Sequence, residues 1–407
     1  MNYVLTGRLA LMMFVQFFIW GSWATTLGNY MGTIGMSASI ALAYSMGPIA
    51  CIVAPFFVGM VADRFFHTEK VLGVLFLLSG VALAFMPAFA GSPLFLTLLG
   101  IHALAYFPSL SLTTSLSFHH MTNQEKEYPV VRVFGTIGWI VAGVIISKVF
   151  QADFEPTPLY IGAAASIFLG LYCFTLPATP PPAAGRKTSW REIAGIDALK
   201  QLRSRSLIVF LISAMLAYIA FGTYFPYAPV YLAGVGIDNP AFQMTFGQMS
   251  EIFFMLLIPF FFRRLGVKWM LMIGLTAWFV RFGLFSWAAI DATYWMIFLG
   301  IAIHGMCYDF FFVTGQIYID KKTSPEIRGQ VQGLLVLLSF GVGFLIGTQG
   351  SGMVFNSLVA DGTLAPEQWR LFWGIFSAIA LAFAIFFFAF FDDRVEDRED
   401  IDAIPVG

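Results

Sequence analysis

The chain of 407 residues is built from apolar stretches of about 20 residues separated by short polar segments. An α-helix needs about 20 apolar residues to cross the roughly 30 Å hydrocarbon core of a bilayer, where every backbone polar group must be bonded internally. Charged residues make up only 11% of the chain, against about 25% in an ordinary soluble domain. The sequence therefore predicts an all-α membrane protein and excludes a soluble domain with a single core.

Apolar windows predict 12 transmembrane helices, six on each side of a central polar segment. The predicted helices cover residues 8–31, 38–62, 70–90, 94–118, 130–151, 158–177, 206–233, 242–263, 268–289, 293–318, 328–356 and 367–391. Residues 179–205 begin with a run of prolines followed by polar and charged residues, which is typical of a linker. We expect an N-terminal six-helix half (1–178), a cytoplasmic linker (179–205), a C-terminal half (206–392) and an acidic cytoplasmic tail (393–407).

The positions of the basic residues predict the orientation. Of the 22 lysine and arginine residues, all but Lys148, Arg281 and Arg370 fall on the side that carries both termini and the linker. Because cytoplasmic loops are enriched in lysine and arginine, both termini are predicted to face the cytoplasm. A net charge of −1 gives no basic surface for nucleic acid, so we expect no such partner.

Ionisable residues inside the predicted helices point to a functional site, because each costs about 2.5 to 3.5 kcal/mol at the bilayer centre. Glu251 lies in the middle of the eighth helix, and Gln248 projects from the same face one turn earlier. We interpret the two as substrate-binding residues and Glu251 as a proton carrier, with Asp309 on the tenth helix as a second proton-coupling candidate. The alternative is a permanent structural pair between Glu251 and Arg281.

Three helices carry polar and aromatic residues at helical spacing. His304, Tyr308 and Phe312 repeat at i, i+4 and i+8, and such a stripe can stack on a flat polar ligand. Arg132, Thr136 and Trp139 share a face of the fifth helix, and Gln16 and Trp20 share a face of the first. The alternatives are ordinary packing for the aromatic stripe and an interfacial position for Arg132.

Other residues suggest conformational roles. Pro226 lies in a seventh helix rich in tyrosine and proline, which makes that helix a candidate gate. Arg281, a cation in the outer half of the ninth predicted helix, is a second candidate for a conformational role. Gly59, near the end of the second predicted helix, is followed by Asp63 and Arg64 in an order that resembles the loop signature of the major facilitator superfamily. This resemblance implies the major facilitator fold of two pseudo-symmetric halves.

Five blocks of sequence are more specific than that loop. They are QFFIWGSWATTLGNY (16–30), RVFGTIGW (132–139), GQMSEIFFMLLIPFF (247–261), YDFF (308–311) and IRGQVQG (327–333). Through them the chain resembles the nucleoside:proton symporters of that superfamily. The resemblance implies that Arg132, Thr136, Trp139, Gln248, Glu251 and Tyr308 surround a nucleoside. The chain departs from the family at Gly222 and Phe225, where a glutamine and an asparagine are expected, and at His304, where a tyrosine is expected.

The expected function is import of nucleosides by proton symport through alternating access in a bacterial inner membrane, by a monomer without a cofactor. The alternatives are a carrier for another small polar solute, such as a sugar or a modified nucleoside, and a membrane receptor or enzyme. We expect no enzyme, because no nucleophile with its base is evident. Cys51, Cys173 and Cys307 lie in apolar stretches without metal-ligand spacing, so no metal site is expected.

Overall fold

The computed structural model describes residues 3–54, 66–181, 204–323, 325–359 and 364–392, and these residues form helices and connecting turns with no strand. Ten of the described helical segments are long and apolar enough to cross a membrane, and the shorter apolar helix α8 (Thr157–Cys173) lies among them. The predicted all-α membrane class is therefore confirmed.

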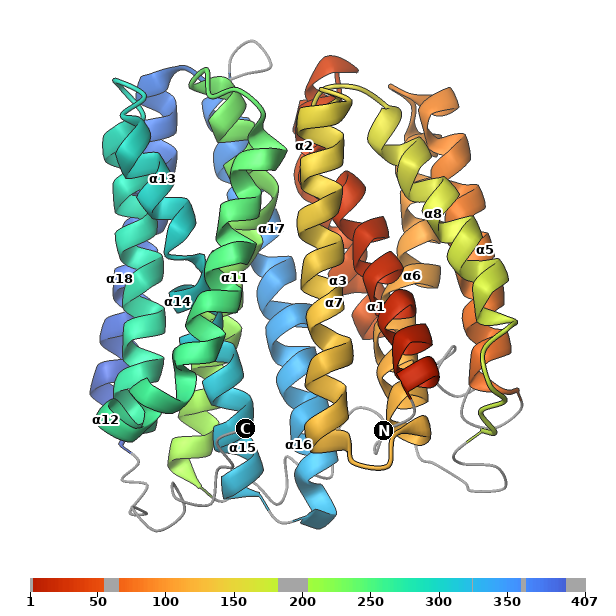
Figure 1. Ribbon diagram of the computed structural model, residues 1–407. Helices are drawn as coiled ribbons and strands as arrows, with labels where there is room; N and C mark the ends of the chain where they lie inside the picture. The colour runs from red at the N-terminus through yellow and green to blue at the C-terminus, as the bar shows by residue number, and fades with distance from the viewer. Residues whose placement is uncertain (1–2, 55–65, 182–203, 324, 360–363, 393–407) are drawn as a thin grey trace.

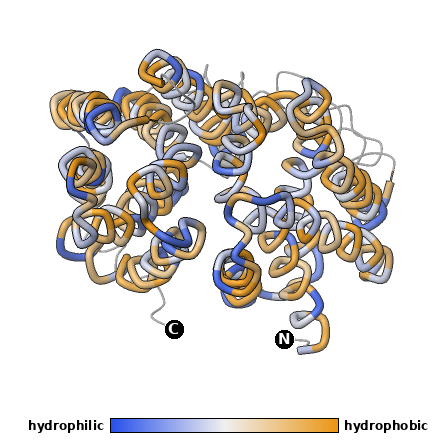
Figure 2. Tube along the Cα trace, turned by 90° about the horizontal axis from the view of Figure 1, so that it is seen from above, coloured by the Kyte–Doolittle hydropathy of each residue, from blue (hydrophilic) through white to orange (hydrophobic). Residues whose placement is uncertain are grey.

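The helices form two bundles that lie side by side (Figures 1 and 2). The first bundle contains α1 (Tyr3–Ala24), α2 (Leu27–Thr33), α3 (Ile40–Ala54), α5 (Thr68–Phe85), α6 (Pro93–His120), α7 (Gln124–Val144) and α8. The second contains α11 (Arg205–Gly234), α12 (Pro240–Ala288), α13 (Tyr294–Ala302), α14 (His304–Tyr308), α15 (Thr314–Lys322), α16 (Pro325–Val336), α17 (Phe344–Leu358) and α18 (Pro366–Phe390). Within the bundles, α1 packs along α7, α5 along α8, α12 along α18 and α11 along α17.

Helix α12 contains a reversal of the chain. Its 49 residues would form a straight rod of about 74 Å, more than twice the hydrocarbon thickness. The backbone of Gly266 leaves the helical conformation, with φ 68° and ψ 175°, a region open mainly to glycine. The two arms, 240–265 and 267–288, agree with the predicted helices 242–263 and 268–289.

Several predicted helices are interrupted rather than regular. The predicted helix 293–318 consists of α13, α14, a π-helical turn at Asp309–Val313 and α15. Further π-helical turns lie at Ile145–Val149, after α7, and at Leu337–Gly343, between α16 and α17. Such turns are frequent at functional sites, because each inserts one residue and rotates the side chains that follow.

Large apolar side chains cover the outer faces of both bundles. Phe85 is 57% exposed, Leu171 58% and Ile385 58%. Residues of this kind are normally buried in water-soluble proteins. Their exposure on the periphery fits a protein surrounded by lipid.

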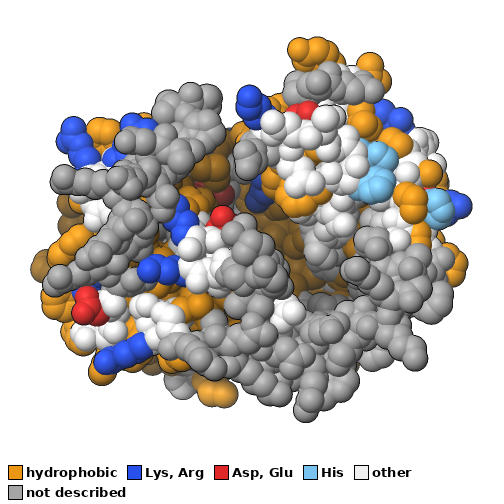
Figure 3. All heavy atoms as spheres, turned by 90° about the horizontal axis from the view of Figure 1, so that it is seen from below, with side chains coloured by type: hydrophobic (Ala, Val, Ile, Leu, Met, Phe, Trp, Pro, Cys, Tyr) orange, Lys and Arg blue, Asp and Glu red, His pale blue; other side chains and the backbone are white. Residues whose placement is uncertain are grey.

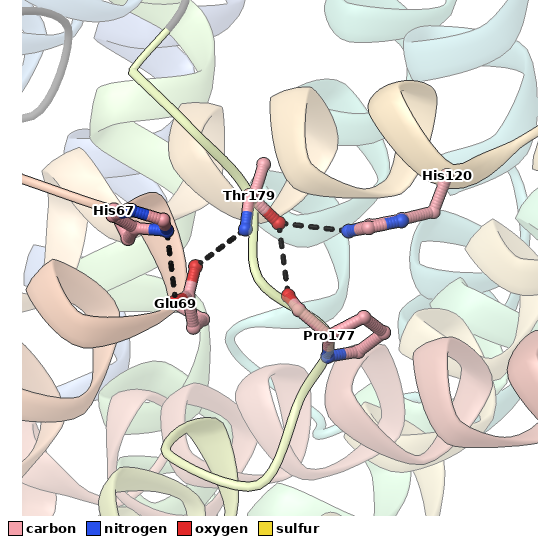
Figure 4. Close-up of polar contacts among 5 residues, drawn as sticks. All are labelled: His67, Glu69, His120, Pro177 and Thr179. Atoms are coloured by element: carbon pink, nitrogen blue, oxygen red, sulfur yellow. Dashed lines mark hydrogen bonds and ion pairs between the residues drawn. The ribbon is translucent and has the colours of Figure 1, made fainter.

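A polar network fixes the chain segment that follows α8 (Figure 4). The Thr179 backbone N–H donates to Glu69 Oε2 at 2.9 Å, and the Thr68 N–H donates to the Thr179 carbonyl at 3.0 Å. The Thr179 hydroxyl lies 2.8 Å from His120 Nε2, and His67 Nδ1 lies 3.5 Å from Glu69 Oε1. These contacts hold the segment against the start of α5 and the end of α6, just before residues 182–203, most of the expected linker, which lie outside the described residues.

Candidate functional site

A cavity of about 500 Å³ lies between the two bundles and is lined by helices of both. The first bundle contributes side chains from α1, α3, α6 and α7, and the second from α11, α12, α14, α15 and the segment 336–340. The predicted site residues that line it are Trp20, Arg132, Thr136, Trp139, Gln248, Glu251, His304 and Tyr308.

The cavity extends towards the end of the molecule that carries the N-terminus of α1, the lower end in Figure 1. Its wall includes Thr114 near the end of α6, Tyr128 near the start of α7 and Gln316 on α15. The view from below shows this face hollowed between the bundles (Figure 3). The cavity therefore opens at the lower end.

At the upper end the two bundles are joined by hydrogen bonds. The Asn29 amide donates to the Pro229 carbonyl at 3.3 Å, and the Asn356 amide donates to the Ala38 carbonyl at 3.0 Å. Ser45 Oγ lies 2.8 Å from Thr348 Oγ1 and accepts from Gln349 Nε2 at 2.7 Å. These contacts connect α2 and α3 with α11 and α17, so the cavity is closed on this side.

One wall of the cavity is the predicted face of α7. Arg132, Thr136 and Trp139 all line it, as their helical spacing predicts. The Arg132 guanidinium lies 4.4 Å from the centre of the Phe17 ring on α1, a cation–π contact. This wall offers a cation, a hydroxyl group and an aromatic face to a ligand.

The opposite wall is formed by α12 and α14. Gln248 and Glu251 line the cavity from the first arm of α12, and His304 and Tyr308 line it from α14. The Gly305 backbone N–H donates to Ser250 Oγ at 2.9 Å, which holds the two helices together. Among the described residues, Gln248 Oε1 and His304 Nδ1 are buried atoms without a hydrogen-bond partner. Buried polar atoms in that state are candidates to bind a ligand or water.

Aromatic rings from both bundles meet at the upper end of the cavity. The Trp20 ring centre lies 5.2 Å from that of Trp139 and 6.1 Å from that of Phe225 on α11. Phe107 and Phe340 complete this group, at 5.3 Å and 6.4 Å from Trp20. The cavity is therefore aromatic at its closed end and polar along its sides, which suits a flat ligand with hydrogen-bonding groups.

Two predicted binding residues do not line the cavity. Gln16 is fully buried between α1 and α6, where its Nε2 donates to Ser109 Oγ at 2.9 Å and its Oε1 accepts from Thr113 Oγ1 at 2.8 Å. Phe312 packs with its ring centre 4.3 Å from that of Tyr218. Both sit one layer behind the cavity wall.

Two other ionisable residues that the sequence analysis singled out, Arg281 and Asp309 of the second bundle, are also buried behind the wall. Arg281 donates from Nε to the Gly300 carbonyl at 2.8 Å, and its guanidinium lies 4.1 Å from the Tyr224 ring centre and 4.8 Å from that of Trp278. Within the described residues, no ion pair joins Arg281 to Glu251. Asp309 is fully buried, and neither of its carboxylate oxygens has a hydrogen-bond partner among the described residues.

The predicted conformational residues are spread over the molecule. Pro226 is buried in α11, which continues as one helix past it, and does not line the cavity. Gly59, Asp63 and Arg64 lie outside the described residues.

Several cavity residues were not predicted as site residues from the sequence. They are Phe17, Phe107, Ser111, Thr114, Tyr128, Tyr218, Phe221, Phe225, Gln316, Ser339 and Phe340, among others. Gln316 had a usable signal, because an amide in a membrane helix needs a polar partner. Phe225 also had a signal, because it stands where the family is expected to have an asparagine. The other phenylalanines had none, since they resemble lipid-facing or core residues in sequence. Among the described residues, no group of three or more His, Cys, Asp or Glu could hold a metal ion.

Comparison with known proteins gives consistent results along the whole chain. Residues 3–396 match the nucleoside H+ symporter family. The protein YegT of Escherichia coli (strain K12) is 40% identical over 87% of this chain and 85% of its own. The nucleoside permease NupG of the same strain is 32% identical over 90% of this chain and 91% of its own.

Solved structures agree. A crystal structure of a mutant of the nucleoside transporter NupG covers 95% of this chain and 100% of its own, with 29% identity and a TM-score of 0.87. The D-xylose-proton symporter, at 13% identity and a TM-score of 0.72, covers 96% of this chain and 98% of its own and shares the fold. The fold is thus the major facilitator fold, and these relatives and solved structures are transporters rather than enzymes. The chain belongs to the nucleoside H+ symporter family of membrane transporters.

Proposed function

We propose that this chain is a secondary active transporter that imports nucleosides together with protons by alternating access. The observation that carries the proposal is the cavity between the bundles, where Gln248 and Glu251 face Arg132, Thr136 and Trp139. A nucleoside joins a flat base to a sugar rich in hydroxyl groups. Aromatic side chains suit the base, and the amide, carboxylate and hydroxyl groups suit the sugar and the edges of the base.

Membership of the nucleoside H+ symporter family and the similarity to the nucleoside permease NupG support this substrate. The binding residues of the proposal are Trp20, Arg132, Thr136, Trp139, Gln248, Glu251, His304 and Tyr308. Gln16 and Phe312 act behind them as supports for the cavity wall. Arg281 and Pro226 stabilise the second bundle as it moves. Gly59, Asp63 and Arg64, which lie outside the described residues, are assigned the stabilisation of one conformation of the transporter.

Proton coupling is assigned to Glu251, with Asp309 as a second proton carrier. Glu251 is a carboxylate at the cavity surface and has no ion-pair partner among the described residues. Apolar surroundings favour the neutral form of a carboxylate over its charged form. When the bundles move and change the surroundings of Glu251, its binding and release of a proton can therefore be linked to their conformation. The buried and unpartnered carboxylate of Asp309 supports a second role of the same kind.

The proposal includes the topology. The chain crosses a bacterial inner membrane 12 times, with the two arms of α12 as separate crossings and both termini in the cytoplasm. The halves are 1–178 and 206–392, joined by a linker at 179–205 and followed by an acidic tail at 393–407. Lysine and arginine side chains spread over the lower face support its assignment to the cytoplasm (Figure 3). The cavity then faces the cytoplasm, and one chain encloses it, so a monomer suffices.

The coupling role is tested with Glu251→Gln in proteoliposomes. This variant should keep nucleoside exchange but lose accumulation driven by a pH gradient, because a glutamine cannot carry a proton. Glu367→Gln, at an exposed carboxylate at the start of α18, is the matched control and should accumulate nucleoside like the wild type. Undiminished accumulation by Glu251→Gln would rule out Glu251 as the coupling group.

The substrate class is tested by thermal unfolding with a panel of nucleosides and sugars. A ligand that binds only the folded state raises the apparent stability with its concentration. Stabilisation by nucleosides alone supports the proposal. Stabilisation by a sugar alone would replace it with the carrier for another polar solute.

A further inference from the structure

Asp153 joins the two bundles at the closed end of the cavity. It lies in the loop after α7, and only 4% of its surface is exposed. Its Oδ2 accepts a hydrogen bond from Ser147 Oγ of the same bundle at 2.6 Å. Its Oδ1 accepts from the backbone N–H of Ala241 in the second bundle at 2.8 Å. One buried carboxylate thus connects a side chain of its own bundle to the backbone of the other.

No described residue next to the start of α12 accepts a hydrogen bond from the first N–H groups of that helix through its side chain. The first N–H groups of a helix have no partner within the helix, and a negative charge is favourable beside them. The residue that precedes α12, Asn239, makes no side-chain capping bond to the helix, and its backbone is left-handed, with φ 54°. Pro240 at the first helical position has no N–H to donate. Asp153 therefore serves as the cap of α12 from across the interface between the bundles.

Neighbouring contacts strengthen the same connection. In the amide orientation that satisfies both neighbours, Asn239 donates to the Ser147 carbonyl at 2.7 Å and accepts from Lys148 Nζ at 3.3 Å. Lys148 Nζ also lies 4.7 Å from the ring centre of Phe242. Ser147 and Lys148 belong to the π-helical turn Ile145–Val149, which ends α7.

We propose that Asp153 is an outer latch: its bond to the Ala241 N–H, supported by Ser147, stabilises the conformation in which the cavity opens only at the lower face. The bond to Ser147 lies within one bundle and persists when the bundles move. The bond to Ala241 crosses the interface, so it must break before the cavity can open at the upper end. The latch rests on the alternating access proposed above, although it involves no residue of the cavity.

The test measures opening of the upper end directly. Ser45 is fully buried in a different part of the same interface, between α3 and α17. Ser45→Cys in a Cys51→Ser background places a reporter thiol there, while the remaining Cys173 and Cys307 are fully buried. The reporter reacts with a maleimide only when the upper end opens, so its rate follows the population of the opened conformation.

Asp153→Ala should raise this labelling rate by about 10- to 150-fold. That range corresponds to about 1.5 to 3 kcal/mol for one hydrogen bond to a charged group, at about 1.4 kcal/mol per factor of ten. Asp153→Asn keeps an oxygen acceptor for the Ala241 N–H and should give a smaller rise. Glu155→Gln is the matched control, because Glu155 lies in the same loop, is exposed, and accepts only from Thr157 at 3.3 Å among the contacts described. It should leave the rate unchanged.

An Asp153→Ala rate equal to that of Glu155→Gln would overturn the latch. If Cys173 and Cys307 of Asp153→Ala also react, that variant has unfolded, and Asp153→Asn decides instead. A rise above the control then supports the latch, and no rise overturns it. The labelling uses neither nucleoside nor a pH gradient. A failure of the latch therefore leaves the Glu251 test intact, and a failure of nucleoside transport leaves the latch test intact.

Discussion

Replacing Gly138 with alanine should destabilise the first bundle and disturb the α7 wall of the cavity. Gly138 lies where α7 crosses α1, and a Cβ at this position would stand 2.2 Å from the Phe14 carbonyl oxygen, 3.0 Å from its carbonyl carbon and 3.2 Å from its Cα. All three are backbone atoms, so no side chain can rotate away. An ordinary carbon–oxygen contact is about 3.3 to 3.6 Å, so the two helices would have to separate by about 1 Å.

The loss of folding stability in Gly138→Ala is the difference between two opposing effects. Overpacking costs about 1 to 3 kcal/mol, and a clash with backbone belongs at the upper end of that range. Alanine stabilises a helix interior by about 1 kcal/mol relative to glycine, which offsets part of that cost. The net loss of about 2 kcal/mol lowers the melting temperature by about 4 to 8 °C, at about 2 to 4 °C per kcal/mol for a unit of 150 to 250 residues.

Thermal unfolding in detergent, followed by tryptophan fluorescence, measures this loss. Gly7→Ala is the matched control. Gly7 lies on α1, the helix that Gly138 contacts, and a Cβ at Gly7 would meet nothing within 4 Å. Gly7→Ala should therefore leave the melting temperature unchanged or raise it. Nucleoside binding to Gly138→Ala should also weaken, since Trp139 is the next residue. An unchanged melting temperature for Gly138→Ala would refute the close crossing of α1 and α7.

Three further substitutions separate binding from support. Trp139→Ala should weaken nucleoside binding by about 5- to 150-fold in a ligand titration, because stacking of a base on an aromatic ring contributes about 1 to 3 kcal/mol. An unchanged affinity would show that Trp139 is not part of the binding site. Gln16→Leu should lower the melting temperature without changing the order of preference among nucleosides, because the Gln16 amide makes hydrogen bonds with Ser109 and Thr113 behind the cavity wall. A changed order of preference would show that Gln16 contacts the nucleoside. Arg281→Lys should lower the melting temperature, because a compact ammonium loses the guanidinium contacts with two aromatic rings. An equal melting temperature would show that those contacts contribute nothing to stability.

Helical spacing predicted which residues share a face but not what that face meets. Arg132, Thr136 and Trp139 share a face and line the cavity. Gln16 and Trp20 were grouped by the same argument, yet Trp20 lines the cavity while Gln16 bonds to α6. Two residues one turn apart can meet different neighbours, because the edge of a cavity is set by how helices cross.

Local irregularity explains why the stripe on the tenth predicted helix only partly reaches the cavity. His304 and Tyr308 line it, whereas Phe312 lies in the π-helical turn Asp309–Val313 and packs against Tyr218. A π-helical turn inserts a residue and rotates every side chain after it. Regular helical spacing cannot anticipate that rotation.

The sequence by itself determined that this chain is an all-helical membrane protein and which of its helices carry polar groups. Those properties are local, because the cost of placing a backbone or a charge in hydrocarbon depends on a single segment. Only the tertiary structure decided that Glu251 faces a cavity while Arg281 and Asp309 are buried behind its wall. It also decided that Phe225 joins Trp20 and Trp139 at the closed end. Likewise, it decided that Asp153 caps a helix of the other bundle. These features depend on contacts between helices far apart in the chain, and the spacing of residues within one helix contains no information about its neighbours.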